Sequence, residues 1–228
     1  MLKLEGVTKS YGGLRSRMVL RDVTLALARG EFVPIMGESG VGKSTLLNLI
    51  AGLDVPDAGR IVLEDTDLTP LDDRARTLIR RERMGFVFQA FHLLPHLTVA
   101  RNVRLPLDLA GVPGAEAERR TQAILEAAGI ASLARDYPRT LSGGEAQRTA
   151  IARALVHQPS LVLADEPTGN LDADSAAQVL TLLRDEVKRR AGAGVLVTHS
   201  EAAARVADRV YELTATGLTH RALRPGAA

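Results

Sequence analysis

The stretch that decides the fold is a glycine-rich loop that ends in a lysine and two hydroxyl residues: Gly37-Glu38-Ser39-Gly40-Val41-Gly42-Lys43-Ser44-Thr45. It matches the phosphate-binding pattern G-x-x-x-x-G-K-[ST], and it lies between an apolar run at 32–36 and a helical pattern at 46–50. Glycines let the backbone wrap around phosphate oxygens, and N–H groups at a helix N-terminus bind anions. We expect Lys43 to meet the β- and γ-phosphates and Ser44 to bind Mg²⁺. The flanking pattern disfavours the alternative, a glycine-rich turn with a chance lysine.

The bulk composition fits one large α/β domain or two small ones, because 228 residues with 46% hydrophobic content can bury a sizeable core. The net charge is only +2 and the arginines are scattered, so we expect no nucleic-acid partner. The chain has no cysteine, which excludes a disulfide or a thiolate metal site. Without a long apolar run or a signal-peptide core, the sequence predicts a soluble intracellular chain.

Two segments near the start alternate apolar and polar residues, at 2–8 and 21–28, and both are expected to be strands with one buried face. Tyr11 lies in a turn signal between them. It is either a stacking platform for a base or a plain loop aromatic. Pro34 falls inside the expected strand at 31–36, so we predict that its nitrogen faces a gap or a bulge in the sheet.

The rest of the chain alternates helical and strand patterns. Thr98 is expected to cap a helix that Pro106 interrupts. The concentration of helices between about 90 and 157 predicts a helical subdomain inserted in an α/β core. The other expected helices lie at 46–51, 71–83, 114–128, 146–156 and 173–191, and the other expected strands at 60–64, 84–88, 161–164, 194–198 and, last, 208–213.

Asp165 and Glu166 directly follow a continuous apolar strand pattern. Ligands bind at the carboxyl ends of strands in α/β sheets, so both carboxylates are expected beside the phosphate-binding loop. Asp165 would hold Mg²⁺ through water, and Glu166 would act as general base on the attacking water. The alternative is an ordinary acidic strand end, which the loop in the same chain disfavours.

Gln89 and His199 also terminate apolar strands. Gln89 could reach Mg²⁺ or the attacking water, and His199 the γ-phosphate; alternatively each is a satisfied loop residue. His92 and His96 have the spacing of a metal pair, but Pro95 disfavours a helix there and no third ligand is evident.

A second candidate anion site reads Leu141-Ser142-Gly143-Gly144-Glu145 and is followed by a helical pattern. It combines a hydroxyl, approachable glycine N–H groups and a helix dipole that favours negative charge. If the two anion sites cannot meet on one subunit, a head-to-tail dimer would bring each to the nucleotide of the other.

With these motifs in this order, the sequence resembles the nucleotide-binding subunit of an ATP-binding cassette (ABC) transporter over all but its last ten or so residues. Further matches, at 85–89, 94–98 and 163–172, resemble the lipoprotein-releasing and macrolide-exporter branch. The motifs that carry the resemblance are Tyr11, the loop at 37–45, Gln89, the stretch 141–145 with Gln147-Arg148, 161–166, 169–172 and His199.

The resemblance implies a P-loop NTPase (RecA-like) α/β core with an antiparallel β subdomain and an inserted α-helical subdomain. The single domain would divide into a core at 1–88 and 158–220, helices at about 89–157 and a tail at 221–228. Its cofactors would be ATP and Mg²⁺. Four sequence departures from the common family pattern, at Pro34, Ala146, Thr149 and Ser200, affect no expected catalytic group.

The resemblance also implies roles at matching positions. Tyr11 would stack on adenine, Gln89 would link the nucleotide state to the membrane subunit, and His199 would sense the γ-phosphate. Asp172 would connect the two sites of a dimer. The remaining cofactor contacts would come from the partner-facing patch Ser142, Gly143, Gly144 and Glu145.

These roles describe an ATPase that closes as a dimer of two copies and moves a separately encoded transmembrane permease. It would be cytoplasmic and peripheral on the inner face of the membrane. The apolar loop at 91–97 is either the docking surface or buried in the helical subdomain. One alternative is a cell-division type ATPase that signals without transport. A soluble ABC protein acting on DNA or ribosomes is disfavoured, since those usually carry two cassettes or a long coiled coil.

Overall fold

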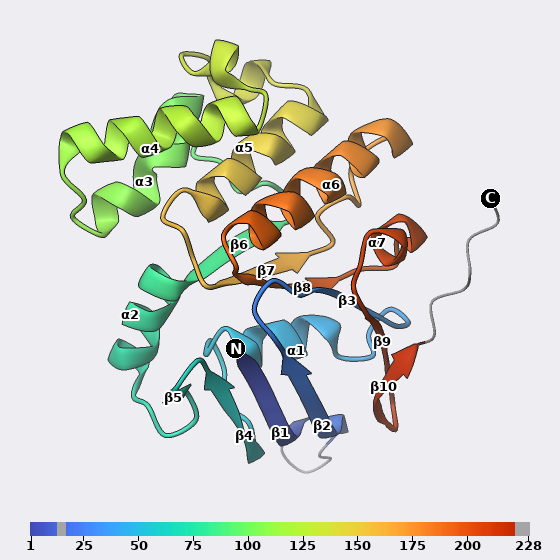
Figure 1. Ribbon diagram of the computed structural model, residues 1–228. Coiled ribbons are helices and arrows are strands. Elements are labelled where there is room, and N and C mark those ends of the chain that lie inside the picture. Colours follow the sequence, from blue (N-terminus) through green and yellow to red (C-terminus); the bar gives the residue numbers. More distant parts are fainter. Residues whose placement is uncertain (13–16, 222–228) are drawn as a thin grey trace.

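The protein, described here by a computed structural model over residues 1–12 and 17–221, is built on two sheets (Figure 1). A four-stranded antiparallel sheet has the order β2-β1-β4-β5, and a six-stranded sheet has the order β10-β9-β3-β8-β7-β6. The α/β class predicted from the sequence is therefore confirmed. The strands are β1 Leu2–Tyr11, β2 Arg17–Leu27, β3 Phe32–Met36, β4 Ala58–Leu63, β5 Thr66–Asp67, β6 Met84–Phe88, β7 Leu161–Asp165, β8 Ala193–Val197, β9 Val210–Thr214 and β10 Gly217–Arg221.

The helices divide between the two sheets and a separate helical layer. Figure 1 shows α1 between the sheets, with α3, α4 and α5 grouped on the far side of the six-stranded sheet, next to α6. The α-helices are α1 Lys43–Ile50, α2 Asp73–Arg83, α3 Val99–Leu109, α4 Gly114–Ala127, α5 Gly143–Leu155, α6 Ala173–Arg189 and α7 Glu201–Arg205, with short 3₁₀ helices at Ala131–Leu133 and Pro138–Thr140. Over the described residues, none of these helices combines the length and apolar character needed to cross a bilayer.

Two apolar cores fix the position of α1 and α5. Leu46 and Ile50 of α1 are fully buried in a core that joins both sheets. Ile151 of α5 and Val179 of α6 belong to the second core, which includes the helical layer. α2 has no buried residue, so the solvated helix predicted at 71–83 is confirmed.

The register of the parallel strands brings distant segments to one edge. Asp165 at the end of β7 pairs with Phe88 at the end of β6 and with Val197 at the end of β8. β8 in turn pairs with β3, which leads into the phosphate-binding loop. The residues that follow β3, β6, β7 and β8 therefore emerge side by side, as expected for ligand sites in α/β sheets.

Pro34 lies in β3 where its missing N–H costs no sheet bond. The Phe32 oxygen accepts from the backbone of Asp208, so alternate residues Phe32 and Pro34 face the β9 side of β3. The pairs between β3 and β9 begin only at Ile35 with Tyr211. The gap predicted at Pro34 is therefore the place where the pairing of β3 with β9 stops.

Three local expectations are wrong. The helix capped by Thr98 continues through Pro106 to Leu109, because Val103 and Leu107 are fully buried and packing outweighs one lost helix bond. Tyr11 belongs to β1 instead of a turn. The strand near 208–213 is not the last, since β10 follows it as an antiparallel partner of β9.

Candidate active site

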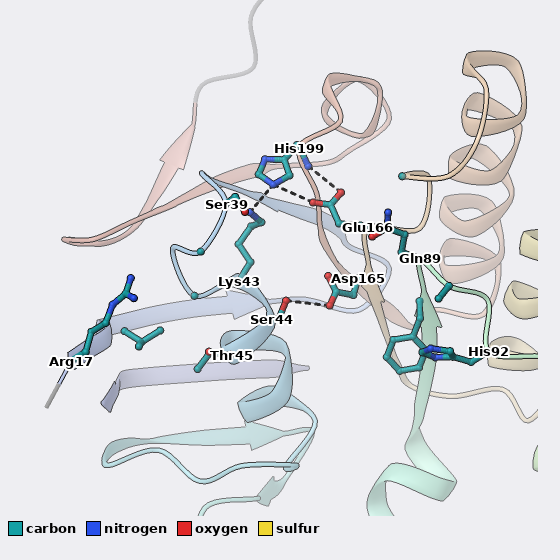
Figure 2. A pocket seen from close by; sticks show the side chains of 16 residues that line it. Arg17, Ser39, Lys43, Ser44, Thr45, Gln89, His92, Asp165, Glu166 and His199 are labelled. Carbon is teal, nitrogen blue, oxygen red and sulfur yellow. Dashed lines mark hydrogen bonds and ion pairs between the residues drawn. The ribbon is translucent and has the colours of Figure 1, made fainter. Parts of the chain in front are cut away.

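A cavity of about 910 Å³ opens at the carboxyl edge of the six-stranded sheet. Figure 2 shows the phosphate-binding loop on one side, Asp165 and Glu166 beyond it, and Gln89 at the far wall. The predicted residues that line it are Ser39, Gly40, Gly42, Lys43, Ser44, Thr45, Gln89, Asp165, Glu166 and His199.

The phosphate-binding loop needs its glycines at two close approaches. Gly42 has φ of 116°, and a Cβ there would lie 2.8 Å from Cγ1 of Val19 on β2. Gly37 has φ of 152°, and its Cβ would lie 2.5 Å from the carbonyl oxygen of Leu213 on β9. Larger residues would push the loop away from both strands.

Lys43 is the first residue of α1 and is only 8% exposed. Its amine donates to the carbonyl oxygens of Gly37 and Glu38, at 2.8 and 2.9 Å, and lies 3.0 Å from Nε2 of His199. Burial lowers the pKa of Lys43, and the nearby charges of Glu166 and Asp165 oppose that shift. The loop thus positions the Lys43 amine at the cavity.

Ser44 and Asp165 bring two side-chain oxygens together at the cavity. The Ser44 hydroxyl donates to Oδ2 of Asp165 at 3.2 Å. Burial raises the pKa of Asp165, and the Ser44 hydrogen bond works against this. Among the described residues there is no cluster of three or more His, Cys, Asp or Glu that could hold a metal. A hydroxyl and one carboxylate suit Mg²⁺, which takes few protein ligands and completes its shell with water and phosphate oxygens.

Glu166 has a strained backbone, with φ of 43°. Its N–H donates to the Val197 oxygen at 2.9 Å, so the strand beside it fixes this conformation. Its Oε1 lies 3.4 Å from Nε2 of His199, and its Oε2 accepts from the His199 N–H at 3.3 Å. Strain held in place by surrounding structure is typical of functional sites.

Gln89 lines the cavity, but its amide does not contact Ser44 or Asp165. Its Nε2 donates to Oδ1 of Asn170 at 3.2 Å, and Nδ2 of Asn170 donates to the backbone carbonyl oxygen of Gln89 at 3.0 Å. A Cβ on Gly169 would lie 2.7 Å from that same amide nitrogen. The loop after β7 therefore holds Gln89 against the cavity wall.

Several predicted residues lie outside the cavity lining. Tyr11 is 45% exposed, and its hydroxyl donates to Asp54. Gly37, Glu38 and Val41 belong to the loop but do not line the cavity. The exposed Asp172 does not line it either, and it caps α6 by accepting from the Ser175 N–H. Sequence reasoning missed Arg17 and Val19, which also line the cavity. Figure 2 shows Arg17 at the end away from Gln89. No local pattern marks them, because only the packing of β2 brings them there.

The second candidate anion site is formed by neighbours in the sequence, apart from the cavity. Ser142 and Glu145 make a capping box at the start of α5, with Ser142 N–H donating to Oε2 of Glu145 at 2.8 Å. The bond from the Ser142 hydroxyl and this backbone bond lower the pKa of Glu145. Ser142 and Gly143 are exposed, Gly144 is buried, and none of the four lines the cavity.

The comparisons with known proteins agree on one family. A family model described as ABC transporter matches residues 20–169. An uncharacterized ABC transporter ATP-binding protein of Mycobacterium tuberculosis is 47% identical over 88% of this chain and 81% of its own length. The lipoprotein-releasing system ATP-binding protein LolD of Legionella pneumophila is 45% identical, over 93% of this chain and 94% of its own.

A solved structure matches the fold over almost the whole chain. The ATP-binding cassette MJ0796, in a dimeric post-hydrolysis state bound to ADP and Pi, superposes with a TM-score of 0.88 at 40% identity. The match covers 99% of this chain and all of that one. The P-loop core fold expected from the sequence is thereby confirmed.

Proposed function

The chain belongs to the ABC transporter family as an ATP-binding subunit, and on this premise we propose that it hydrolyses ATP·Mg²⁺ in a head-to-tail dimer that drives a separately encoded transmembrane permease. The observation that carries the proposal is the meeting of Lys43, Glu166 and His199 in one cavity, with His199 Nε2 3.0 Å from the lysine amine and 3.4 Å from the carboxylate.

Each group at this edge has a separate task in the proposal. Lys43 and the loop N–H groups bind the β- and γ-phosphates, and Ser44 with Asp165 holds Mg²⁺. Mg²⁺ supplies neutralisation of the phosphate charge. Glu166 orients the attacking water in line with the γ-phosphate and takes up its proton, while His199 donates to a γ-phosphate oxygen.

The dimer is supported by the separation of the two anion sites. Ser142 and Gly143 are exposed and do not line the cavity of their own subunit, so a partner copy is needed to bring them to a nucleotide. The two glycines and the α5 N-terminus then face the γ-phosphate. Asp172, exposed at the start of α6, lies at the same proposed interface. The dimeric MJ0796 cassette supports this arrangement by similarity.

The permease is proposed to be of the lipoprotein-releasing or macrolide-exporter type, with the chain peripheral on the cytoplasmic face of the membrane. Relatives named LolD support this branch. The loop at 91–97 is the proposed docking surface. Pro95 and both histidines of the loop are exposed, and its apolar residues are half-buried: Phe91, Leu93, Leu94 and Leu97. The loop therefore packs in part against the subunit and leaves part of its surface open to a partner.

The decisive experiment replaces Glu166 with Gln, which keeps the shape and removes the base. We expect stable ATP-dependent dimers by light scattering and phosphate release at least about 100-fold slower than wild type. Glu82→Gln, on the exposed face of α2, is the matched control and should hydrolyse normally. Normal turnover in Glu166→Gln would remove that residue from its role. A membrane protein that co-purifies with the chain would identify the partner, and a partner bound to cell-wall hydrolases would favour the cell-division alternative.

A further inference from the structure

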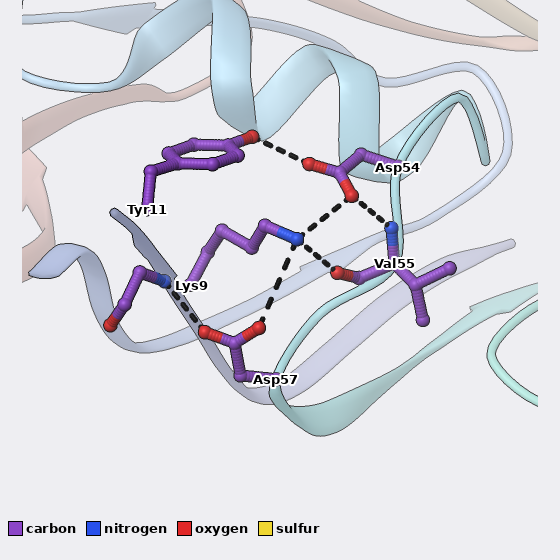
Figure 3. Close-up of polar contacts among 6 residues, drawn as sticks. Lys9, Tyr11, Asp54, Val55 and Asp57 are labelled. Atoms are coloured by element: carbon purple, nitrogen blue, oxygen red, sulfur yellow. Dashed lines mark hydrogen bonds and ion pairs between the residues drawn. The ribbon is translucent and has the colours of Figure 1, made fainter. Parts of the chain in front are cut away.

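Tyr11 is held by its hydroxyl rather than left as a free loop aromatic. The hydroxyl donates to Oδ2 of Asp54 at 2.5 Å (Figure 3). Asp54 follows α1, the helix that begins with Lys43, and its Oδ1 also accepts from the Val55 N–H at 2.7 Å. One carboxylate thus joins the end of β1 to the loop after α1.

Lys9 fixes that carboxylate from the other side. It is 8% exposed, and its amine donates to Oδ1 of Asp54 at 2.8 Å and to the Val55 oxygen at 2.7 Å. Oδ1 of Asp57 lies 3.8 Å from the same amine, and Oδ2 of Asp57 accepts from the Ser10 N–H at 2.7 Å. The Lys9 amine therefore has three oxygen neighbours, which offset the cost of burying its charge.

The protonation states match this network. Burial opposes the charge on Lys9, but its bond to Asp54 holds the lysine pKa above its usual value. Burial also works against the charge on Asp54, and the bonds from Lys9 and Tyr11 hold that pKa below its usual value. The bond to Asp54 raises the pKa of the Tyr11 phenol. The phenol stays neutral and keeps its proton to donate.

The network also reaches the cavity. The side chain of Thr45, which lines the cavity two residues after Lys43, lies close enough to the Tyr11 phenol to oppose the rise in its pKa. The Lys9 amine lies 5.1 Å from the centre of the Tyr11 ring. With its hydroxyl engaged by Asp54, the tyrosine offers a ligand its ring face.

We propose that Asp54 and Lys9 are positioning residues that hold the Tyr11 ring as a stacking face for the purine of a nucleotide bound at the phosphate loop. The inference rests on the proposed function, because it needs a nucleotide in the cavity. In this proposal Asp54 and Lys9 support binding of the base, and the phosphate-binding loop binds the phosphates. Stacking uses the π-face of the base, so ATP and GTP depend on the network alike.

The test separates the base from the phosphates. Calorimetry measures the binding of Mg·ATP and of Mg·tripolyphosphate, which has no base, to wild type, Asp54→Ala and Asp54→Asn. We expect Asp54→Ala to weaken ATP binding by about 3- to 10-fold, part of the stacking contribution, and to leave tripolyphosphate binding within about 2-fold. Asp54→Asn, whose amide oxygen can still accept a hydrogen bond from Tyr11, should lose less ATP affinity than Asp54→Ala. In turnover, KM for ATP rises and kcat stays.

Two further variants guard the interpretation. Tyr11→Phe keeps the ring and removes only its hydroxyl, so it should reproduce the Asp54→Ala loss of ATP binding. Glu5 lies on β1, like Lys9 and Tyr11, and forms an exposed ion pair with Arg60 of β4, so Glu5→Ala should change the binding of neither ligand. Thermal unfolding of every variant shows which remain folded.

Each remaining outcome overturns a stated claim. Unchanged ATP affinity in both Asp54→Ala and Tyr11→Phe overturns the positioning role alone. Equal weakening of ATP and tripolyphosphate assigns the network to the stability of the loop and overturns its role in base binding. A wild-type protein that binds neither ligand overturns the proposed function, and the inference with it.

Discussion

The Ser44 hydroxyl lies 3.2 Å from the Asp165 carboxylate, although 121 positions separate the two residues in the chain. Two strands, β8 and β7, connect the phosphate-binding loop to Asp165 across the sheet. The pair is therefore a product of strand order, and it gives the proposed magnesium site its two protein oxygens.

Asp165→Asn removes the charge of this pair and keeps its size. Because an aspartate that orients metal-bound water contributes through charge, we expect magnesium affinity in the ATPase reaction to fall by roughly 10- to 100-fold. A magnesium titration of the hydrolysis rate measures this. Asp72→Asn, at the exposed N-cap of α2, is the control, since Asn caps a helix equally well. An unchanged titration midpoint would place the metal elsewhere.

Asn102→Ala should loosen the loop at 91–97. The Asn102 side chain is fully buried, accepts from Leu94 N–H at 2.7 Å, and donates to the carbonyl oxygens of Leu94 and Leu97 at 3.1 and 3.0 Å. Loss of these bonds leaves buried polar groups unpaired, so we expect a loss of about 2–4 kcal/mol in unfolding free energy.

Hydrogen exchange tests the location of that effect. Amides at 91–97 should be accelerated by a larger factor in Asn102→Ala than those of β7, which report global unfolding. Gln122→Ala, which breaks one exposed bond to Glu126, should cost little and leave the loop unchanged. Uniform acceleration over the whole chain would show that Asn102 supports the fold and not the loop.

Gly59→Ala should destabilise the protein far more than Gly129→Ala. Both glycines have positive φ, 84° and 66°, so alanine is strained at each by about 1–2 kcal/mol. A Cβ on Gly59 would also overlap the carbonyl oxygens of Gly6 and Glu5 in β1, whereas nothing lies near one on Gly129. Urea unfolding should show at least about 3 kcal/mol for Gly59→Ala. Equal losses would mean that the β1–β4 contact can relax.

Glu186→Gln should flatten the dependence of stability on pH. Burial opposes the charge on Glu186, but bonds from Arg189 and Arg190, at 2.6 and 3.1 Å, hold its pKa below 4.5 in the folded state. A depressed folded pKa adds stability above the unfolded pKa and loses it as pH falls through the folded value. The stability advantage of wild type over Glu186→Gln should therefore be full at neutral pH and shrink below about pH 4.5.

Urea unfolding at several pH values gives this difference. The neutral-pH advantage should be roughly 1–3 kcal/mol, because the carboxylate is nearly buried and keeps two arginines paired. Glu82→Gln is the control. Glu82 forms an exposed ion pair with Arg81 on α2, and this pair should contribute under about 1 kcal/mol to the unfolding free energy. A wild-type advantage that grows toward acid pH would have the opposite sign and contradict the assignment.

Local patterns were enough to predict most of the residues that line the candidate site. The phosphate-binding loop is contiguous in the sequence. The strands that lead to Gln89, Asp165 and His199 are short apolar runs, each followed by a polar residue. These features depend on neighbours in the sequence, so no tertiary information is needed to recognise them. Pro106 misled the sequence analysis for the same reason, since its local rule ignores the buried side chains that keep α3 helical.

The sequence by itself therefore determined the motif, the α/β class and which side chains stand at strand ends, because hydrophobic period and turn chemistry act over a few residues. Only the tertiary structure decided that Asp165 meets Ser44, that Asn170 engages the Gln89 amide, and that Lys9 and Asp54 hold Tyr11. Those contacts depend on the order β3-β8-β7-β6 and on the packing of α1 between two sheets. Strand order is set by the burial of whole surfaces, which no short stretch of sequence encodes.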